Sequence, residues 1–357
     1  MLRSRDTVQA GFGKEELTTA YTLSNVSMLY KDGDDHRLQR RQTARLFAPS
    51  TVDDRYQPII EREAAVLAAE LATRKRAQAN DLSARLAVRV SAEVVGLTES
   101  LAPGGYLRRI ERVTSSEIAQ PGWRPRQLAA FVRMQLPAAA LFLLDVLPAI
   151  RARRRSPQLD LVSHLLAKGM NPIEILTECI LFGAASIVTT REFIGVALWH
   201  LLDQPALADR YRAAGQDERY AILNEILRVE PVLGHLYRRA TADIPVRAGG
   251  RDLVVPAGAL VVLHLHDIVS DPAVVGAEPD TVQPDRALSG RAVPADVMGF
   301  GDGHHRCPGG YLAIQETDIL VRRLLALPGL RIVAPPTVGW HDMADGYELR
   351  DFTLAVD

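Results

Sequence analysis

The pattern of apolar residues predicts helices over most of the first two thirds of the chain. Apolar positions recur at helical spacing after Ser50-Thr51-Val52-Asp53, a segment with the form of a capping box. Residues 82–95 and 127–147 are rich in Ala, Leu and Val, and they predict two further helices. The basic run at residues 151–155 precedes Ser156-Pro157 and predicts a solvated turn.

The longest predicted helix begins at Asn171-Pro172-Ile173-Glu174, where the Asn can cap, the Pro suits the first turn and the Glu sits three residues after the cap. No further proline precedes residue 202, so the helix would have about 31 residues and a length of about 46 Å. Residues 179–190 carry no charge, which predicts a helix through the centre of the protein. Glu178 and Arg191 limit this uncharged stretch to about 12 residues, too few to span a membrane.

Short apolar runs separated by turn residues predict strands after about residue 231. They are residues 244–246, 253–255 and 259–263, separated by Gly249-Gly250 and by Pro256-Ala257-Gly258. Residues 330–333 and 352–356 predict a closing pair of strands. With no internal repeat, the chain is expected to form a single domain over residues 1–357, mainly α with a smaller β region, hence of the α+β class.

Composition and charge exclude several classes of protein. Apolar residues make up 47% and charged residues 24%, which excludes dominant disorder. The 42 basic and 43 acidic residues nearly balance, so nothing indicates a general nucleic-acid-binding protein. The N-terminus has no apolar signal core, and the expected protein is soluble and cytoplasmic, without a membrane partner. The two cysteines, Cys179 and Cys307, are too few for an iron–sulfur cluster or a four-cysteine zinc site.

Residues 300–310 form the segment with the most specific chemistry, Phe-Gly-Asp-Gly-His-His-Arg-Cys-Pro-Gly-Gly, followed by a helical pattern at 311–327. Its glycines allow a tight loop that a flat ligand can approach closely. A cysteine just before a helix is biased toward the thiolate by the helix dipole. The residues alone leave three alternatives: a small buried cysteine, a thiolate ligand or nucleophile, or a zinc site made by His304, His305 and Cys307.

This segment resembles the haem-binding loop of the cytochrome P450 superfamily, the haem-thiolate monooxygenases. The family pattern Phe-x-x-Gly-x-His-x-Cys-x-Gly is met in register by Phe300, Gly303, His305, Cys307 and Gly309. The resemblance implies haem b as cofactor, with the Cys307 thiolate as axial ligand of the iron. It also implies that Phe300, His305 and Gly309 contribute to the cofactor site.

Three further segments resemble family elements and occur in the expected order. Glu225 and Arg228 match the Glu-x-x-Arg pair, and their spacing places both on one helix face. Pro284-Asp285-Arg286 matches the Pro-x-Arg element, which implies that Arg286 joins Glu225 and Arg228 in a buried structural triad. The resemblance also implies that four basic residues bind the haem propionates: His36 and Arg40 from the His-x-x-x-Arg helix, Arg238, and His305.

The central helix resembles the family's dioxygen-binding segment when it is aligned on Thr189-Thr190. Thr189 then matches the threonine that organises protons near bound dioxygen, and Thr189 and Thr190 are the candidate catalytic residues. Two positions depart from the pattern, because Ser186 replaces the usual Gly and Val188 replaces the usual acid. The missing carboxylate leaves open a peroxide-driven, coupling or nitration reaction.

The resemblance implies an enzyme of bacterial soluble type that inserts one oxygen atom from dioxygen into a small organic substrate. The expected electron donor is a separate ferredoxin or flavodoxin with its reductase, docking on Arg40, Arg41, Arg45 and Arg306. The substrate is expected to be a natural product of secondary metabolism, in contact with residues 25–28, 101–140 and 182–189.

The chain departs from the family in length, because several dozen residues normally precede the His-x-x-x-Arg helix. The expected fold therefore lacks the usual N-terminal helix and first strands. Two readings outside the enzyme class stay open at this point: a non-catalytic binding protein of the same haem fold, and a thiol or zinc protein without haem.

Overall fold

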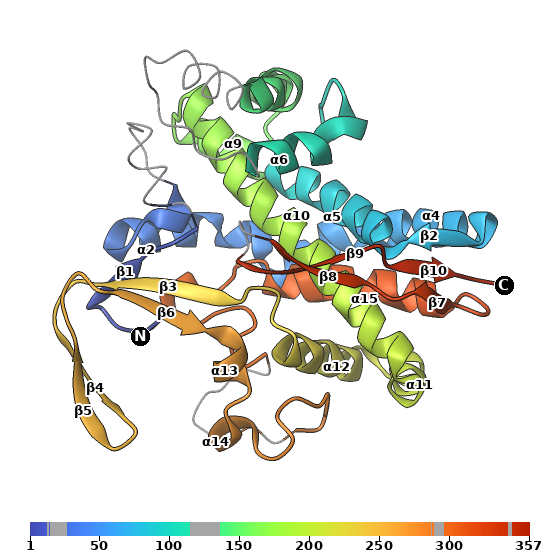
Figure 1. The fold of residues 1–357 in the computed structure, drawn as a ribbon. Helices are drawn as coiled ribbons and strands as arrows, with labels where there is room; N and C mark the ends of the chain where they lie inside the picture. Colours follow the sequence, from blue (N-terminus) through green and yellow to red (C-terminus); the bar gives the residue numbers. More distant parts are fainter. Residues whose placement is uncertain (13, 15–26, 115–135, 287, 289–295, 342–344) are drawn as a thin grey trace, which may run out of the picture.

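The computed structural model describes residues 1–12, 14, 27–114, 136–286, 288, 296–341 and 345–357. Helices form most of it, and the strands gather in small sheets along one side (Figure 1). The α-helices are α2 (Gly33–Thr43), α3 (Pro49–Thr51), α4 (Gln57–Arg74), α5 (Ala79–Val95), α6 (Tyr106–Thr114), α8 (Leu147–Arg155), α9 (Leu161–Ala167), α10 (Pro172–Asp203), α11 (Pro205–Ala213), α12 (Gln216–Val229), α13 (Leu265–Val269), α14 (Pro272–Val275) and α15 (Gly310–Leu325). Shorter helical turns are η1 (Met28–Tyr30), η2 (Ala44–Phe47), η3 (Val52–Tyr56), η4 (Pro103–Gly105), η5 (Phe142–Val146) and η6 (Gly303–His305).

The predicted central helix is confirmed as α10, which crosses the molecule diagonally between α5 and α15 (Figure 1). Its capping box is present: Asn171 Oδ1 accepts from the N–H groups of Ile173 (2.9 Å) and Glu174 (3.0 Å), and the Glu174 carboxylate accepts from the Asn171 N–H (2.8 Å). By length and composition alone α10 would be able to cross a membrane, but half of its most apolar window is buried inside the protein. Such burial is typical of a core helix.

Two details of the predicted helices are wrong. The helical segment near residue 50 starts at Pro49, after Ala48, and its N-cap carries no side-chain hydrogen bond, because Pro at the first position sets the helical backbone without a capping box. Residues 151–155 belong to α8 rather than to a solvated turn. Arg153 is buried there and pairs with Asp160, because Asp160 caps α9 beneath it. Of the predicted helix 127–147, residues 127–135 lie outside the described part, and 136–147 are helical.

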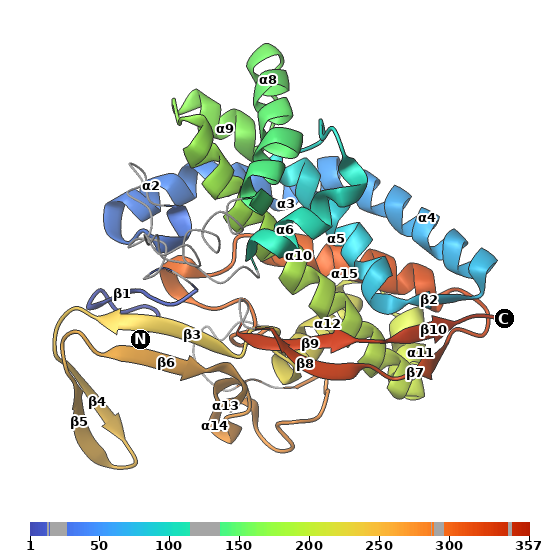
Figure 2. The same cartoon turned by 45° about the horizontal axis from the view of Figure 1, so that its top comes forward.

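The strands form four small sheets with the orders β1-β3-β6, β2-β10-β7, β4-β5 and β8-β9. They are β1 (Thr7–Gln9), β2 (Arg76–Gln78), β3 (His235–Ala240), β4 (Ile244–Ala248), β5 (Arg251–Val255), β6 (Leu260–His264), β7 (Arg331–Ala334), β8 (Thr337–His341), β9 (Gly346–Arg350) and β10 (Thr353–Ala355). The predicted strands β4, β5 and β6 are confirmed, and the closing pair is confirmed as antiparallel β7 and β10. The sheets lie beside α10 and α15, with β4-β5 projecting at one end (Figure 2).

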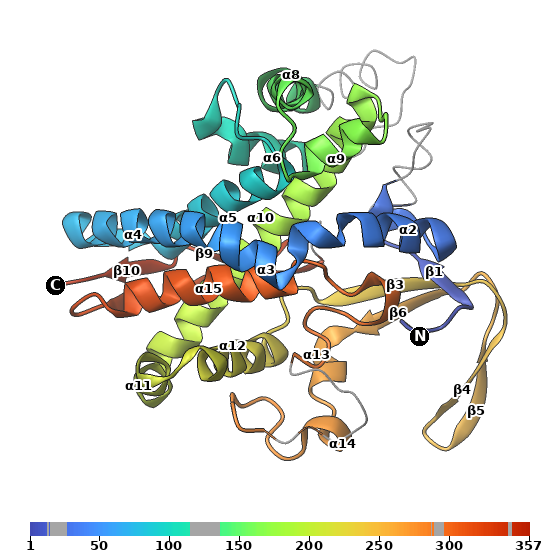
Figure 3. The ribbon, with the colours of Figure 1, turned by 180° about the vertical axis from the view of Figure 1, so that it is seen from behind.

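The apolar core lies on both sides of α10. One cluster joins α4, α5, α12 and α15 to the C-terminal half of α10, and the other joins α6, α8 and α9 to its N-terminal half. Seen from behind, α15 runs close below α4 and α3, and the loop that precedes it lies near α2 (Figure 3). Arg40 of α2 donates to the Arg306 carbonyl, so the loop that precedes α15 lies against α2.

Candidate functional site

The loop that carries Cys307 is fixed by its own backbone and by one buried acid. The Cys307 N–H donates to the Phe300 carbonyl (2.8 Å), which closes the loop on itself. Gly303 has φ +68°, and a Cβ there would come within 2.3 Å of the Leu2 carbonyl oxygen, so the loop requires glycine at this position. Asp296 accepts from the Phe300 N–H (3.0 Å) and pairs with Arg306 (2.7 Å). Sequence reasoning missed Asp296, because a lone acid ahead of the motif has no diagnostic spacing.

The Cys307 residue is exposed to solvent, and its thiol is crowded by protein. Burial by this surrounding protein raises the pKa of the thiol. The Gly309 N–H and the Arg40 guanidinium oppose this rise in pKa without overcoming it. The expected bias toward the thiolate is therefore outweighed by desolvation, and a bound cation is what would favour the ionised sulfur.

One stripe of α10 is open to solvent near the middle of the helix. Ala185 is exposed near the middle of the helix, and Leu181, Phe182 and Thr189 are partly exposed, although their neighbours on the other faces are buried. Phe47 connects this stripe to the Cys307 loop, because its ring stacks on Phe182 (centroids 6.4 Å apart) and a Cβ on Gly309 would lie 3.9 Å from it. An exposed cysteine and an open apolar helix face are thus connected through one aromatic ring, an arrangement that fits a flat ligand held between them.

The candidate catalytic threonines differ in their surroundings. The Thr189 hydroxyl donates to the Ala185 carbonyl of its own helix (2.6 Å), and Thr190 is buried. Val188, which stands where the family has an acid, is 2% exposed and buried. Ser186, the other departure, donates to the Ser91 hydroxyl on α5 (2.7 Å). The hydroxyl of Thr189 is therefore already bonded to its own helix, and Val188 brings no carboxylate to the open stripe.

Four predicted basic residues gather around the loop. His36 stacks on His305 with ring centroids 4.1 Å apart. Arg40 donates to the Arg306 carbonyl oxygen, and Arg238 donates to the Gln9 side-chain oxygen. Burial, together with the charges of His305 and Arg40, lowers the pKa of His36 to about 4. Basic groups that crowd each other in this way would be stabilised by an anionic ligand, which fits a group that carries carboxylates.

Two residues missed by sequence reasoning complete this basic cluster. Asp32 lies 3.1 Å from His305 Nε2, and its carboxylate accepts from the Gln9 N–H (3.1 and 3.0 Å). Gln9 lies on β1, opposite Arg238 on β3. Both residues come from the N-terminal segment, where no motif signalled a role.

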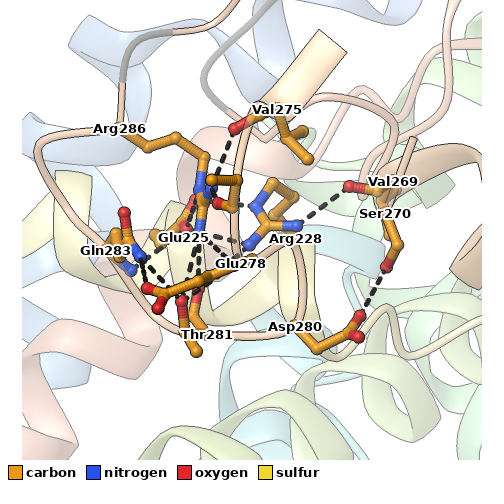
Figure 4. A network of polar contacts seen from close by, with 11 residues as sticks. Glu225, Arg228, Val269, Ser270, Val275, Glu278, Asp280, Thr281, Gln283 and Arg286 are labelled. Atoms are coloured by element: carbon orange, nitrogen blue, oxygen red, sulfur yellow. Dashed lines mark hydrogen bonds and ion pairs between the residues drawn. The ribbon is translucent and has the colours of Figure 1, made fainter. Parts of the chain in front are cut away.

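Glu225, Arg228 and Arg286 meet in a buried network (Figure 4). The Glu225 carboxylate accepts from Arg228 (2.8 and 2.9 Å) and from Arg286 Nε (2.8 Å). The other guanidinium N–H groups donate to backbone carbonyls of the adjoining segment, those of Val269, Val275, Ala277, Glu278 and Thr281. The two guanidinium groups thus share one carboxylate, and backbone carbonyls accept hydrogen bonds from their remaining N–H groups.

Comparison with known proteins identifies the family. The cytochrome P450 family model matches residues 220–327. The biotin biosynthesis cytochrome P450 of Bacillus subtilis (strain 168) is 27% identical over 318 residues, which cover 87% of this chain and 75% of that protein. The plant-inducible cytochrome P450-pinF1 of Rhizobium radiobacter is 28% identical, with 86% and 70% covered.

Solved structures agree with these relatives. The fold superposes on P450BioI, solved with an acyl carrier protein carrying hexadec-9Z-enoic acid, with a TM-score of 0.75 and 25% identity over 93% of this chain and 81% of that one. CalO2 gives a TM-score of 0.76 and 25% identity, with 92% and 80% covered. The chain belongs to the cytochrome P450 superfamily. The predicted P450 fold of the α+β class is confirmed.

Membership of the P450 superfamily defines the chemistry in outline. The protein is a P450-type monooxygenase, and its cofactor is haem b with a cysteine thiolate as axial ligand. Cytochromes P450 act on small molecules and use redox partners. The alternative of a haem-free thiol or zinc protein is thereby overturned, and within the described residues no group of three or more His, Cys, Asp and Glu side chains is arranged to hold a metal ion.

Proposed function

We propose that residues 1–357 form one haem-thiolate domain that inserts an oxygen atom from dioxygen into a small natural product, with Cys307 as the axial ligand. The observation that carries this proposal is that Cys307 is exposed and is connected through Gly309 and Phe47 to the open stripe of α10. Cys179, the other cysteine, is 0% exposed inside the core and is not available to a ligand. The relative named for biotin biosynthesis supports a role in a biosynthetic pathway.

The residues around Cys307 would hold the cofactor both at its iron and at its propionates. Haem with a thiolate ligand supplies the chemistry of dioxygen activation when it is bound. The Gly309 N–H would support the negative charge on the sulfur, and Phe300 would pack beside the loop. His36, Arg40, Arg238 and His305 would hold the propionates through charge-assisted hydrogen bonds.

The open stripe of α10 would form the substrate side of the site. Ala185 and Phe182 offer an apolar surface there, and Thr189, four residues after Ala185, brings a hydroxyl to the same helix face. We assign proton handling to Thr189, with Thr190 behind it. This role requires the Thr189 hydroxyl to exchange its bond with the Ala185 carbonyl for a bond to water or substrate.

The electron donor would be an acidic ferredoxin or flavodoxin that acts in the cytoplasm. Arg41 and Arg45 are exposed on α2 and η2, near the Cys307 loop, and no carboxylate of the described residues pairs with either. Arg306 and Arg40 contribute less free charge, because Asp296 pairs with Arg306 and Arg40 is bonded to a backbone carbonyl. Docking would therefore depend mainly on Arg41 and Arg45.

The absorption spectrum of the reduced, carbon-monoxide-bound protein tests the central assignment. Wild type and Cys179→Ala should both show the long-wavelength band of a thiolate-ligated haem, and Cys307→His should lose it while it retains haem. A thiolate band that persists in Cys307→His would overturn the assignment of Cys307.

A peroxide-driven reaction is the second candidate. Val188 and the inward hydrogen bond of Thr189 favour it, because both reduce the supply of protons to bound dioxygen. Products formed under isotopically labelled dioxygen should carry the label if dioxygen is the oxidant. Turnover with hydrogen peroxide, without label in the product and without an electron donor, would instead support the second candidate.

A further inference from the structure

A pair of histidines faces away from the haem site on the three-stranded sheet. Antiparallel β3 and β6 place His235 directly opposite His264. His235 Nε2 lies 3.1 Å from His264 Nδ1, and the ring centroids are 4.4 Å apart with the planes inclined at 82°. Because side chains alternate along a strand, His235 and Arg238 lie on opposite faces of β3, so the pair is separate from the propionate cluster.

A carboxylate lies beside one ring of this pair. Asp345 Oδ2 lies 3.1 Å from His235 Nδ1, and the Tyr237 hydroxyl donates to the same oxygen. The Asp345 backbone is fixed as well, because its carbonyl accepts from the Gly234 N–H (2.8 Å). Nδ1 makes no hydrogen bond to this carboxylate, so Asp345 acts on the His235 ring through its charge at ion-pair distance.

We propose that His235 Nε2 and His264 Nδ1 together bind a divalent transition-metal cation of the zinc type. Two zinc–nitrogen bonds of about 2.0–2.1 Å at a near-tetrahedral angle separate the nitrogens by roughly 3.3 Å, close to the 3.1 Å observed. Imidazole suits Zn²⁺, Ni²⁺ and Cu²⁺. Asp345 lies against the opposite ring nitrogen and is a positioning residue. Since His264 is exposed, water would complete the coordination.

The cation would connect two strands and a hairpin. It would cross-link β3 to β6 and, through Asp345, would hold the start of β9 against Gly234. A ligand that binds only the folded chain raises its unfolding temperature, so zinc should stabilise the protein against heat.

Calorimetric titration of zinc chloride into the haem-loaded full chain tests this proposal. We expect a single zinc ion per chain, with binding at least tenfold weaker in His235→Gln and in His264→Gln. Asp345→Asn should weaken binding by about 10–100-fold, the usual effect of removing an outer partner. The matched control is His266→Gln, which removes an exposed histidine two residues further along the chain and should bind as wild type.

Trp340 gives a second measurement that needs no histidine variant. Its ring centroid lies 6.2 Å from that of His235, so bound Cu²⁺ should quench its fluorescence, and Trp340→Phe should remove the response. Circular dichroism and the haem spectrum establish that each variant is folded. Zinc affinity that is unchanged in both His235→Gln and His264→Gln, or no saturable zinc binding by wild type, would overturn the proposal and leave the pair as a hydrogen bond.

Discussion

Arg228 has no exposed surface, and its interactions show which parts of the site the sequence could predict. The i,i+3 spacing predicted its pairing with Glu225, and the family resemblance supplied Arg286. The carbonyl partners were not predictable, because they belong to irregular backbone between residues 269 and 281 that has no sequence signal. Asp32 and Asp296 also emerged only from the structure, because a lone acid outside a motif has no diagnostic spacing.

Removing the Arg228 guanidinium should destabilise the protein strongly. Arg228→Met leaves a buried carboxylate with one cation instead of two, and the expected loss is roughly 3–5 kcal/mol of unfolding free energy. Urea denaturation measures it. The matched control is Arg210→Met, which breaks the exposed ion pair with Asp285 beside the same segment and should have little effect. Equal losses in the two variants would contradict the buried role of Arg228.

Glu316 should make stability depend on pH. It is buried on α15, its Oε2 has no hydrogen-bond partner among the described residues, and burial raises its pKa well above the usual value. A raised carboxyl pKa means that its contribution to stability is present at low pH and is lost as pH rises through the folded-state pKa. Glu316→Gln should remove this loss. The measurement is the unfolding free energy of wild type and Glu316→Gln from acidic to alkaline pH. Glu99→Gln, at an exposed position, is the control and should keep the pH dependence of wild type.

Among the helices and strands, local signals explain what was predictable. α10 was predictable because its cap, its first-turn proline and its uncharged middle agree with one another. β3 was not, since His235-Leu-Tyr-Arg-Arg-Ala alternates polar and apolar positions weakly and depends on pairing with β1 and β6. Arg153 was misassigned because a basic run looks solvated until Asp160 is brought beside it by the fold.

The cap of α10 gives a prediction for the whole helix. Asn171→Ala removes two hydrogen bonds to backbone N–H groups and should cost about 1 kcal/mol of unfolding free energy. Asn171→Asp retains an accepting oxygen and should stay close to wild type. Thermal or urea unfolding of the three proteins provides the measurement, and an alanine variant as stable as wild type would contradict the capping role.

Across the whole molecule, the site depends on segments that are far apart in sequence. Phe47, Phe182 and Gly309 come from η2, α10 and the Cys307 loop, and they meet through ring stacking and close approach. The sequence identified the motif residues on each segment, but not the aromatic contact between them, because long-range packing leaves no periodic pattern.

Electron transfer should depend on the charge of one face of the molecule. Reversing Arg41 and Arg45 to Glu should slow reduction by an acidic ferredoxin at low ionic strength, and the difference should shrink as salt rises. Stopped-flow reduction measures the rate. Arg154→Glu with Arg155→Glu, an equal charge change on exposed positions of α8, should leave it unchanged. If both double variants behaved alike, docking on Arg41 and Arg45 would be refuted.

The network in Figure 4 also affects how well residues 269–286 resist proteolysis. Between α13 and Arg286 the backbone has one short helix, α14, and several of its carbonyls are held by guanidinium groups. Loss of the Arg228 or the Arg286 side chain should therefore unfold residues 269–286 locally before the helical core unfolds. A protease at low dose would then cut there first and leave two fragments that stay associated.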